Sequence, residues 1–172
     1  FMAFLASRGI DPASIRIIDM QPSEMPDALA AGSIDAFVAS EPTPSLAELR
    51  GAQELTTMGG LGNSYPVLML AKDKFLKERS EDVLRLLKAI QRGEDFVKQH
   101  PDKAARILSQ ATGLSPKVAH QAMARHCFEL CLDGTTLRSL EKTASFLKQW
   151  GTIEAIPDLD HAVNDRFVAY VV

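Results

Sequence analysis

The first 71 residues alternate between runs of apolar, often β-branched residues and segments of helical composition, and this alternation restricts the fold more than any other feature. The apolar runs predict four strands, at residues 15–20, 34–39, 53–58 and 65–71. Short helices predicted at 23–31 and 45–50 lie between the first three. The run 34–39, with sequence IDAFVA, is too uniformly apolar to have a solvent-facing side, which is typical of a parallel strand covered on both faces. Strands separated by helices predict an α/β fold with a doubly wound parallel sheet.

The sequence changes in character after residue 71, and the remainder is predicted to be mainly helical. A long helix is expected at 80–99, where Val83, Leu87 and Ile90 recur on one face. Further helices are predicted at 104–110, 116–130 and 136–150, and a last one begins at Asp158 and bears Val163, Phe167, Val168 and Tyr170.

Composition excludes several classes of protein. The formal net charge is −3, so no basic excess points to nucleic acid. No apolar run approaches the roughly 20 residues that a membrane-spanning helix needs.

The two cysteines, Cys127 and Cys131, give no disulfide framework. They are four residues apart at the end of the helix predicted to run from 116 to about 130, so we expect them to be buried apolar side chains of a helical core. A zinc site with His126 and an i,i+4 disulfide are the alternatives, and neither has the expected spacing or geometry.

The ordered series of motifs resembles the periplasmic solute-binding proteins of ABC importers, in the branch that binds nitrate, sulfonates, taurine and thiamine precursors. The segment ALAAGSIDAFVASEP (28–42) has the helix, glycine and Asp-Ala strand start of that family. It is followed by the helical run 80–97, the segment 101–114 and the Gly-Thr-Ile at 151–153. The resemblance implies type II periplasmic-binding-protein-like lobes with a parallel sheet, a small-molecule ligand in the cleft between two lobes, and an ABC permease as membrane partner.

On that resemblance, residues 1–63 are part of the second lobe. Residues 64–172 are then the hinge crossing and the C-terminal helices that normally pack on a first lobe, whose sheet is absent. The first residues already read as an amphipathic helix, with Gly9 as its C′ residue, so we expect this chain to be the C-terminal part of a longer one. A true start with a frayed helix is the alternative. If the chain is such a part, dimerisation or another chain segment is expected to cover the helices meant for the missing sheet.

Ligands of parallel α/β sheets bind outside the carboxyl ends of the strands. The residues at the predicted strand ends are therefore the candidate ligand-binding residues, namely Gln21, Ser40, Glu41, Pro42 and Asn63. A carboxylate at position 41 disfavours a small inorganic anion and fits a zwitterionic, cationic or heteroaromatic ligand better. In the alternative reading, Glu41 points to solvent and Pro42 only ends the strand.

The function predicted from these residues is capture of a small molecule without chemistry, in a periplasmic or other extracytoplasmic compartment. No enzyme activity, cofactor, metal or nucleic-acid partner is expected. A pyrimidine-synthase-like enzyme and a ligand-sensing receptor domain on the same scaffold are the alternatives. The four histidines all lie in the predicted helical half, away from the strand ends, which gives the enzyme alternative little support.

Overall fold

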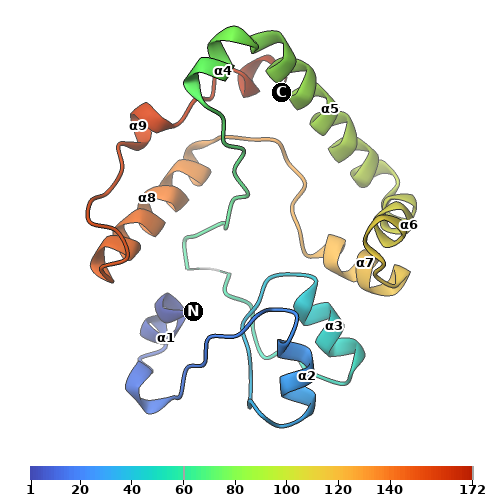
Figure 1. Ribbon diagram of the computed structural model, residues 1–172, viewed down its shortest axis with the longest axis vertical. Helices are drawn as coiled ribbons and strands as arrows, with labels where there is room; N and C mark the ends of the chain where they lie inside the picture. Colours follow the sequence, from blue (N-terminus) through green and yellow to red (C-terminus); the bar gives the residue numbers. More distant parts are fainter. Residues whose placement is uncertain (60, 172) are drawn as a thin grey trace. The chain divides into compact units, whose positions relative to one another are not determined.

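The computed structural model describes residues 1–59 and 61–171, and the described residues form helices joined by turns and extended segments (Figure 1). They group into two compact units, each described separately below. The first contains Phe1–Leu61 and Gln99–Cys127, and the second contains Gly62–Lys98 and Phe128–Val172. The predicted lobe boundary near residue 63 stays a prediction.

The first unit contains five α-helices among its described residues. They are α1 (Met2–Ser7), α2 (Met25–Ala30), α3 (Thr43–Leu49), α6 (Pro101–Thr112) and α7 (Pro116–Ala124), with a 3-10 turn at Pro12–Ser14. Helix α6 packs against α7, and α3 packs against both α2 and α7. The buried residues of α6 and α7 are small: Ala104, Ala105, Val118, Ala119 and Ala122. Small side chains let the two helices approach closely. The core between α6 and α7 is therefore formed by close packing of the helices and not by large apolar side chains.

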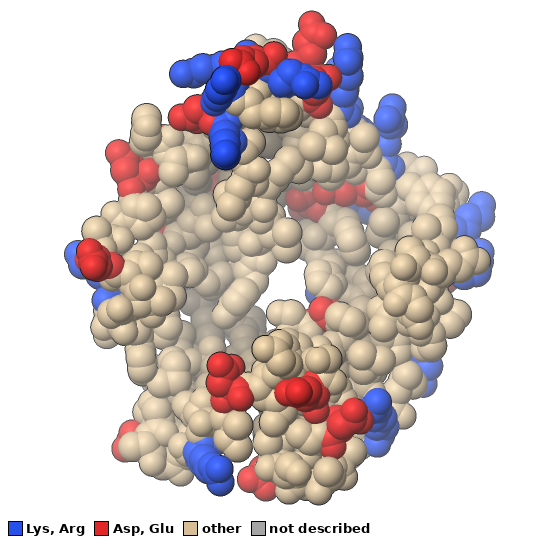
Figure 2. Space-filling view, viewed as in Figure 1, with Lys and Arg blue, Asp and Glu red and all other residues tan. Residues whose placement is uncertain are grey.

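The second unit is built around the long amphipathic helix α5. Its described helices are α4 (Asp73–Glu78), α5 (Ser80–Gln99, whose last residue falls in the first unit), α8 (Gly134–Gln149) and α9 (Leu159–Ala162), with a 3-10 turn at Val168–Tyr170. Val83 and Leu87, one turn apart on α5, form a core with Phe167, and Leu130 packs against it. The opposite face is charged, and Figure 2 shows acidic and basic side chains interspersed over α4 and the start of α5 at the top of the view.

Side-chain caps start several helices. Asp11 accepts a hydrogen bond from Ala13 N (2.9 Å), and Ser115 accepts one from Val118 N (3.3 Å) at the start of α7. Asp158 accepts one from His161 N (3.1 Å) at the start of α9. Gly9 follows α1 with φ +65°, and Ile10 N reaches back to Leu5 O (3.0 Å), which is a Schellman-type helix end.

The predicted α/β fold with a parallel sheet is wrong, because none of the described residues lies in a β-strand. The segments 15–20, 34–39, 53–58 and 65–71 are instead largely extended or irregular and unpaired. Their apolar side chains are correspondingly open to solvent, and Val67 and Leu70 are 96% and 88% exposed. A β-branched run favours an extended backbone locally, but a strand also needs a second chain segment to complete its hydrogen-bonded ladder.

Two further corrections concern the helical region. Helix α7 ends at Ala124, not at Leu130, so Cys127 and Cys131 are not on its face. Both cysteines are exposed, which contradicts the expectation that they are buried in a helix core. Among the described residues, no helix is long and apolar enough to cross a bilayer.

Candidate functional site

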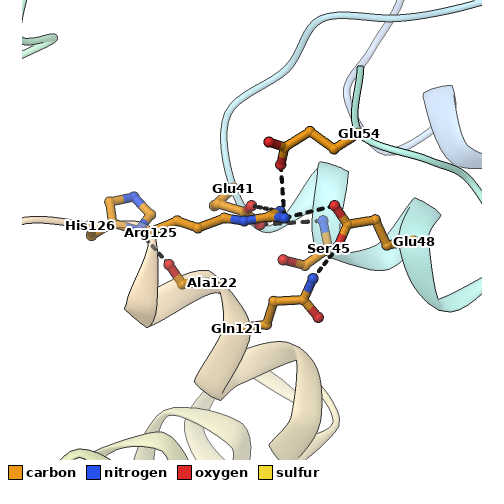
Figure 3. A network of polar contacts seen from close by, with 8 residues as sticks. All are labelled: Glu41, Ser45, Glu48, Glu54, Gln121, Ala122, Arg125 and His126. Carbon is orange, nitrogen blue, oxygen red and sulfur yellow. Dashed lines mark hydrogen bonds and ion pairs between the residues drawn. The ribbon is translucent and has the colours of Figure 1, made fainter. Parts of the chain in front are cut away.

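A polar network in the first unit surrounds the guanidinium group of Arg125 (Figure 3). Its Nη1 lies 2.7 Å from Glu41 Oε1, and its Nη2 lies 2.7 Å from Glu48 Oε1 and 2.8 Å from Glu54 Oε2. Three carboxylates therefore share one guanidinium, and the formal charge of these four side chains is −2. We call these four residues the Arg125 network.

The helices α3 and α7 position this network. Glu41 lies two residues before α3, Glu48 lies in the last turn of α3, and Arg125 is the C-cap residue of α7. Because α3 packs against α7, the carboxylates and the guanidinium meet across that contact. Gln121, one turn before Arg125, also donates to Glu48 Oε2, so two side chains of the same helical face hold Glu48.

Glu41 is the most buried member of the network, with a side chain only 8% exposed. Burial alone would favour its neutral form, but hydrogen bonds from the Arg125 side chain and from Ser45 outweigh burial and lower the pKa of Glu41. The backbone N–H of Ser45 donates to Glu41 Oε2 (3.3 Å). The hydrogen bonds to Glu41 and Glu48 raise the pKa of Arg125 above its already high value. The pair is therefore ionised on both sides at neutral pH.

His126 explains why α7 ends before the cysteines. Its Nδ1 donates to the carbonyl of Ala122 (2.7 Å), which also accepts the backbone N–H of Arg125 (3.2 Å) at the end of the helix (Figure 3). Arg125 and His126 thus hold the end of α7 from two adjacent positions. The chain leaves the helix at this point and reaches Cys127 outside it.

A second polar cluster, in the second unit, ties the loop at 62–65 to α8. Asn63 Nδ2 donates to Thr143 Oγ1 (2.6 Å), and Ser139 Oγ donates to Asn63 Oδ1 (2.8 Å). Asn63 Oδ1 also accepts the backbone N–H of Tyr65 (2.8 Å). Ser139 Oγ in turn accepts the backbone N–H of Ser64 (2.8 Å). Ser139 is buried, so its hydrogen bonds to Asn63 and Ser64 are partly shielded from water and fix the loop to the helix.

The five predicted ligand-binding residues fall in both units. Gln21, Ser40, Glu41 and Pro42 belong to the first, and Asn63 belongs to the second. Gln21 and Ser40 are exposed, while Glu41 is held in the Arg125 network. The peptide bond between Glu41 and Pro42 is cis. The roles of all five as ligand contacts stay predictions.

Glu41 was predicted to be either a ligand contact or a solvent-facing side chain; the structure contradicts the second alternative, and the first stays a prediction. The carboxylate is nearly buried and paired with Arg125, 84 residues away in sequence. Arg125 is not among the residues predicted for the site. Its position one turn after Gln121, at the end of a helix rich in alanine, was the available signal. Among the described residues, no group of three or more His, Cys, Asp or Glu side chains is arranged to hold a metal ion.

Comparison with known proteins gives a consistent family assignment. Residues 1–112 match the model of the NMT1-like family. The chain is also 26% identical, over 156 residues, to a putative aliphatic sulfonates-binding protein of Bacillus subtilis (strain 168). That alignment covers 90% of this chain and 47% of the relative, so the chain spans about half the length of the curated relative it matches. No solved structure matches.

The chain belongs to the NMT1-like family, because the family model covers well over half of its residues. This confirms the resemblance to solute-binding proteins of the sulfonate and nitrate type. The named property of the curated relative is binding and not catalysis, which agrees with the prediction that this chain is not an enzyme.

Proposed function

We propose that this member of the NMT1-like family is the substrate-binding component of an ABC importer, which captures a small molecule outside the cytoplasm and delivers it to a membrane permease. One observation carries this proposal, namely the alignment over 90% of the chain with a putative aliphatic sulfonates-binding protein. An alignment of that extent includes the residues of both compact units. Capture requires binding and release without bond making or breaking.

The ligand that we propose first is an aliphatic sulfonate, with nitrate and a thiamine-precursor-like pyrimidine as the other members of the class. The carboxylate of Glu41 on its own would oppose an anionic ligand. Its ion pair with Arg125 (2.7 Å) offsets part of that charge, although Glu48 and Glu54 share the same guanidinium. The remaining carboxylates of Glu48 and Glu54 are more exposed and are better screened by water.

Ligand-induced stabilisation tests this proposal. The 172-residue chain is melted alone and with pentanesulfonate, taurine, nitrate or an aminopyrimidine, with sodium chloride at matched ionic strength as the control. A ligand present at 100 times its dissociation constant adds roughly 2.7 kcal/mol to the free energy of unfolding. Isothermal titration calorimetry then gives the affinity of any compound that stabilises the chain. If no compound of this panel stabilises the chain or gives binding heat, the proposed function is wrong.

A further inference from the structure

Tyr65 has the most unusual backbone conformation among the described residues. Its φ is +49°, and no other described residue except glycine has a positive φ. The left-handed region is unfavourable for a bulky side chain, and the following Pro66 restricts Tyr65 further. The ring nevertheless lies in solvent, with 68% of the residue exposed. No burial of the ring therefore compensates for the strained backbone.

The hydrogen bonds of Asn63 hold Tyr65 in this conformation. Asn63 Oδ1 accepts from the backbone N–H of Tyr65 (2.8 Å) and from Ser139 Oγ (2.8 Å), so both of its lone pairs are used. Its Nδ2 donates to Thr143 Oγ1 (2.6 Å). An amide with these bonds is well suited to shaping the loop and poorly suited to being the main ligand contact.

A cationic side chain lies against the same loop. Ser139, Lys142 and Thr143 occupy one face of α8, at spacings i, i+3 and i+4. A Cβ atom added to Gly62 would overlap Lys142 Nζ, so the ammonium group packs directly against the backbone of the loop. The loop that presents the phenol of Tyr65 is thus flanked by a positive charge.

We propose that Tyr65 and Lys142 form a subsite for the anionic head group of the ligand, with Asn63 as the positioning residue that presents Tyr65. This inference rests on the proposed function and assigns part of its binding site. The phenol O–H donates a hydrogen bond to a sulfonate oxygen, and the ammonium of Lys142 supplies the opposite charge. Strained residues persist where the surrounding structure holds them, and such residues cluster at ligand-binding positions.

The test uses a substitution that separates binding from stability. Asparagine adopts the left-handed conformation more readily than tyrosine, so Tyr65→Asn relieves strain while it removes the phenol. The matched control is Tyr170→Asn, because Tyr170 is the only other tyrosine and is also exposed in the second unit. Pentanesulfonate is the probe, and calorimetry and thermal melting are the measurements.

We expect Tyr65→Asn to lower the affinity for pentanesulfonate at least tenfold while the melting temperature stays the same or rises. Lys142→Gln is expected to lower the affinity several-fold, and Tyr170→Asn is expected to leave it unchanged. Asn63→Leu should weaken binding in the wild-type background but add nothing in the Tyr65→Asn background, because it acts through Tyr65. An independent structural role would make the two losses additive.

The outcomes distinguish this inference from the proposed function. If the wild-type chain binds the sulfonate and Tyr65→Asn binds it equally well, the subsite is refuted and the proposed function stands. If Tyr65→Asn loses affinity and stability together, the residue is structural and the subsite is again refuted. If the wild-type chain binds none of the compounds in the panel, the proposed function fails, and the subsite fails with it.

Discussion

Replacement of Arg125 by methionine tests how strongly the Arg125 network stabilises the first unit. The substitution keeps a long flexible side chain but removes the charge and every hydrogen-bond donor. It leaves Glu41, only 8% exposed, without its cation. Glu48 and Glu54 lose the same partner, and their side chains are 20% and 41% exposed.

The expected loss follows from these exposures. Breaking a fully buried ion pair costs about 3–5 kcal/mol, whereas an exposed pair contributes about 0–1 kcal/mol. The Arg125 side chain is 31% exposed, so we place its bond to Glu41 below the buried range, at about 2 kcal/mol. The two more exposed carboxylates add a few tenths of a kcal/mol each. We therefore expect Arg125→Met to lower the free energy of unfolding by about 2–3 kcal/mol at pH 7.

Urea unfolding followed by circular dichroism at 222 nm measures this loss. Arg50→Met is the matched control, because Arg50 pairs with Asp27 in the same unit and their side chains are 49% and 75% exposed. The control should cost less than about 1 kcal/mol. If the two variants lose the same stability within about 0.5 kcal/mol, the reasoning from burial is refuted.

The pH dependence gives a second measurement on the same variant. The folded-state pKa of Glu41 is lowered in the wild type, so its stabilising contribution is present above the unfolded pKa and is lost as the pH falls through the folded pKa. Without Arg125, burial favours the protonated form of Glu41, and the variant recovers stability on acidification. The difference between wild type and Arg125→Met should therefore shrink as the pH falls from 7 through 4.5, the ordinary pKa of a glutamate side chain. A difference that stays constant from pH 7 to pH 4 contradicts this assignment.

Three further predictions concern the second unit. Leu87→Ala should cost about 2–3 kcal/mol in urea unfolding, because Leu87 is a buried core residue, whereas the same change at half-exposed Leu86 should cost less than about 1 kcal/mol. Gly62→Ala should lower the melting temperature, since Gly62 has φ +72° and a Cβ there would displace Lys142, whereas Gly93→Ala in α5 meets open space and should raise it. The backbone N–H of Thr136 donates a hydrogen bond to Asp133 and lowers the pKa of that carboxyl. The start of α8 should therefore lose protection from hydrogen exchange as the pH falls through that pKa. The Asp133→Asn variant should show less of this acid dependence.

Local chemistry was predicted well from the sequence. The helix at Ser80–Gln99 begins and ends where its apolar periodicity and charges place it. Asp11, Ser115 and Asp158 cap the segments that follow them, because a side-chain oxygen and a backbone N–H two or three residues away need no other part of the chain. The end of α7 was predicted wrongly, because its apolar pattern continues past Ala124. His126 bonds the carbonyl of Ala122, and Arg125 bonds carboxylates that are distant in sequence.

The candidate site was predicted only in part. Position 41 was selected because it follows a run expected to be a strand, and the structure does place Glu41 in a polar network. Its partner Arg125 could not be derived, because nothing in the local sequence brings residues 84 positions apart into contact. The roles of Gln21, Ser40, Pro42 and Asn63 in ligand binding stay predictions.

The sequence by itself determined the family and the position of the long helix Ser80–Gln99. The strands that it predicted at 15–20, 34–39, 53–58 and 65–71 were wrong. Only the tertiary structure decided that those runs remain unpaired, that Glu41 meets Arg125, and that Asn63 holds Tyr65 in a left-handed conformation. The physical reason is the range of the interactions. Helices and caps form between residues a few positions apart, whereas strand pairing and ion pairs between distant residues depend on how the whole chain packs.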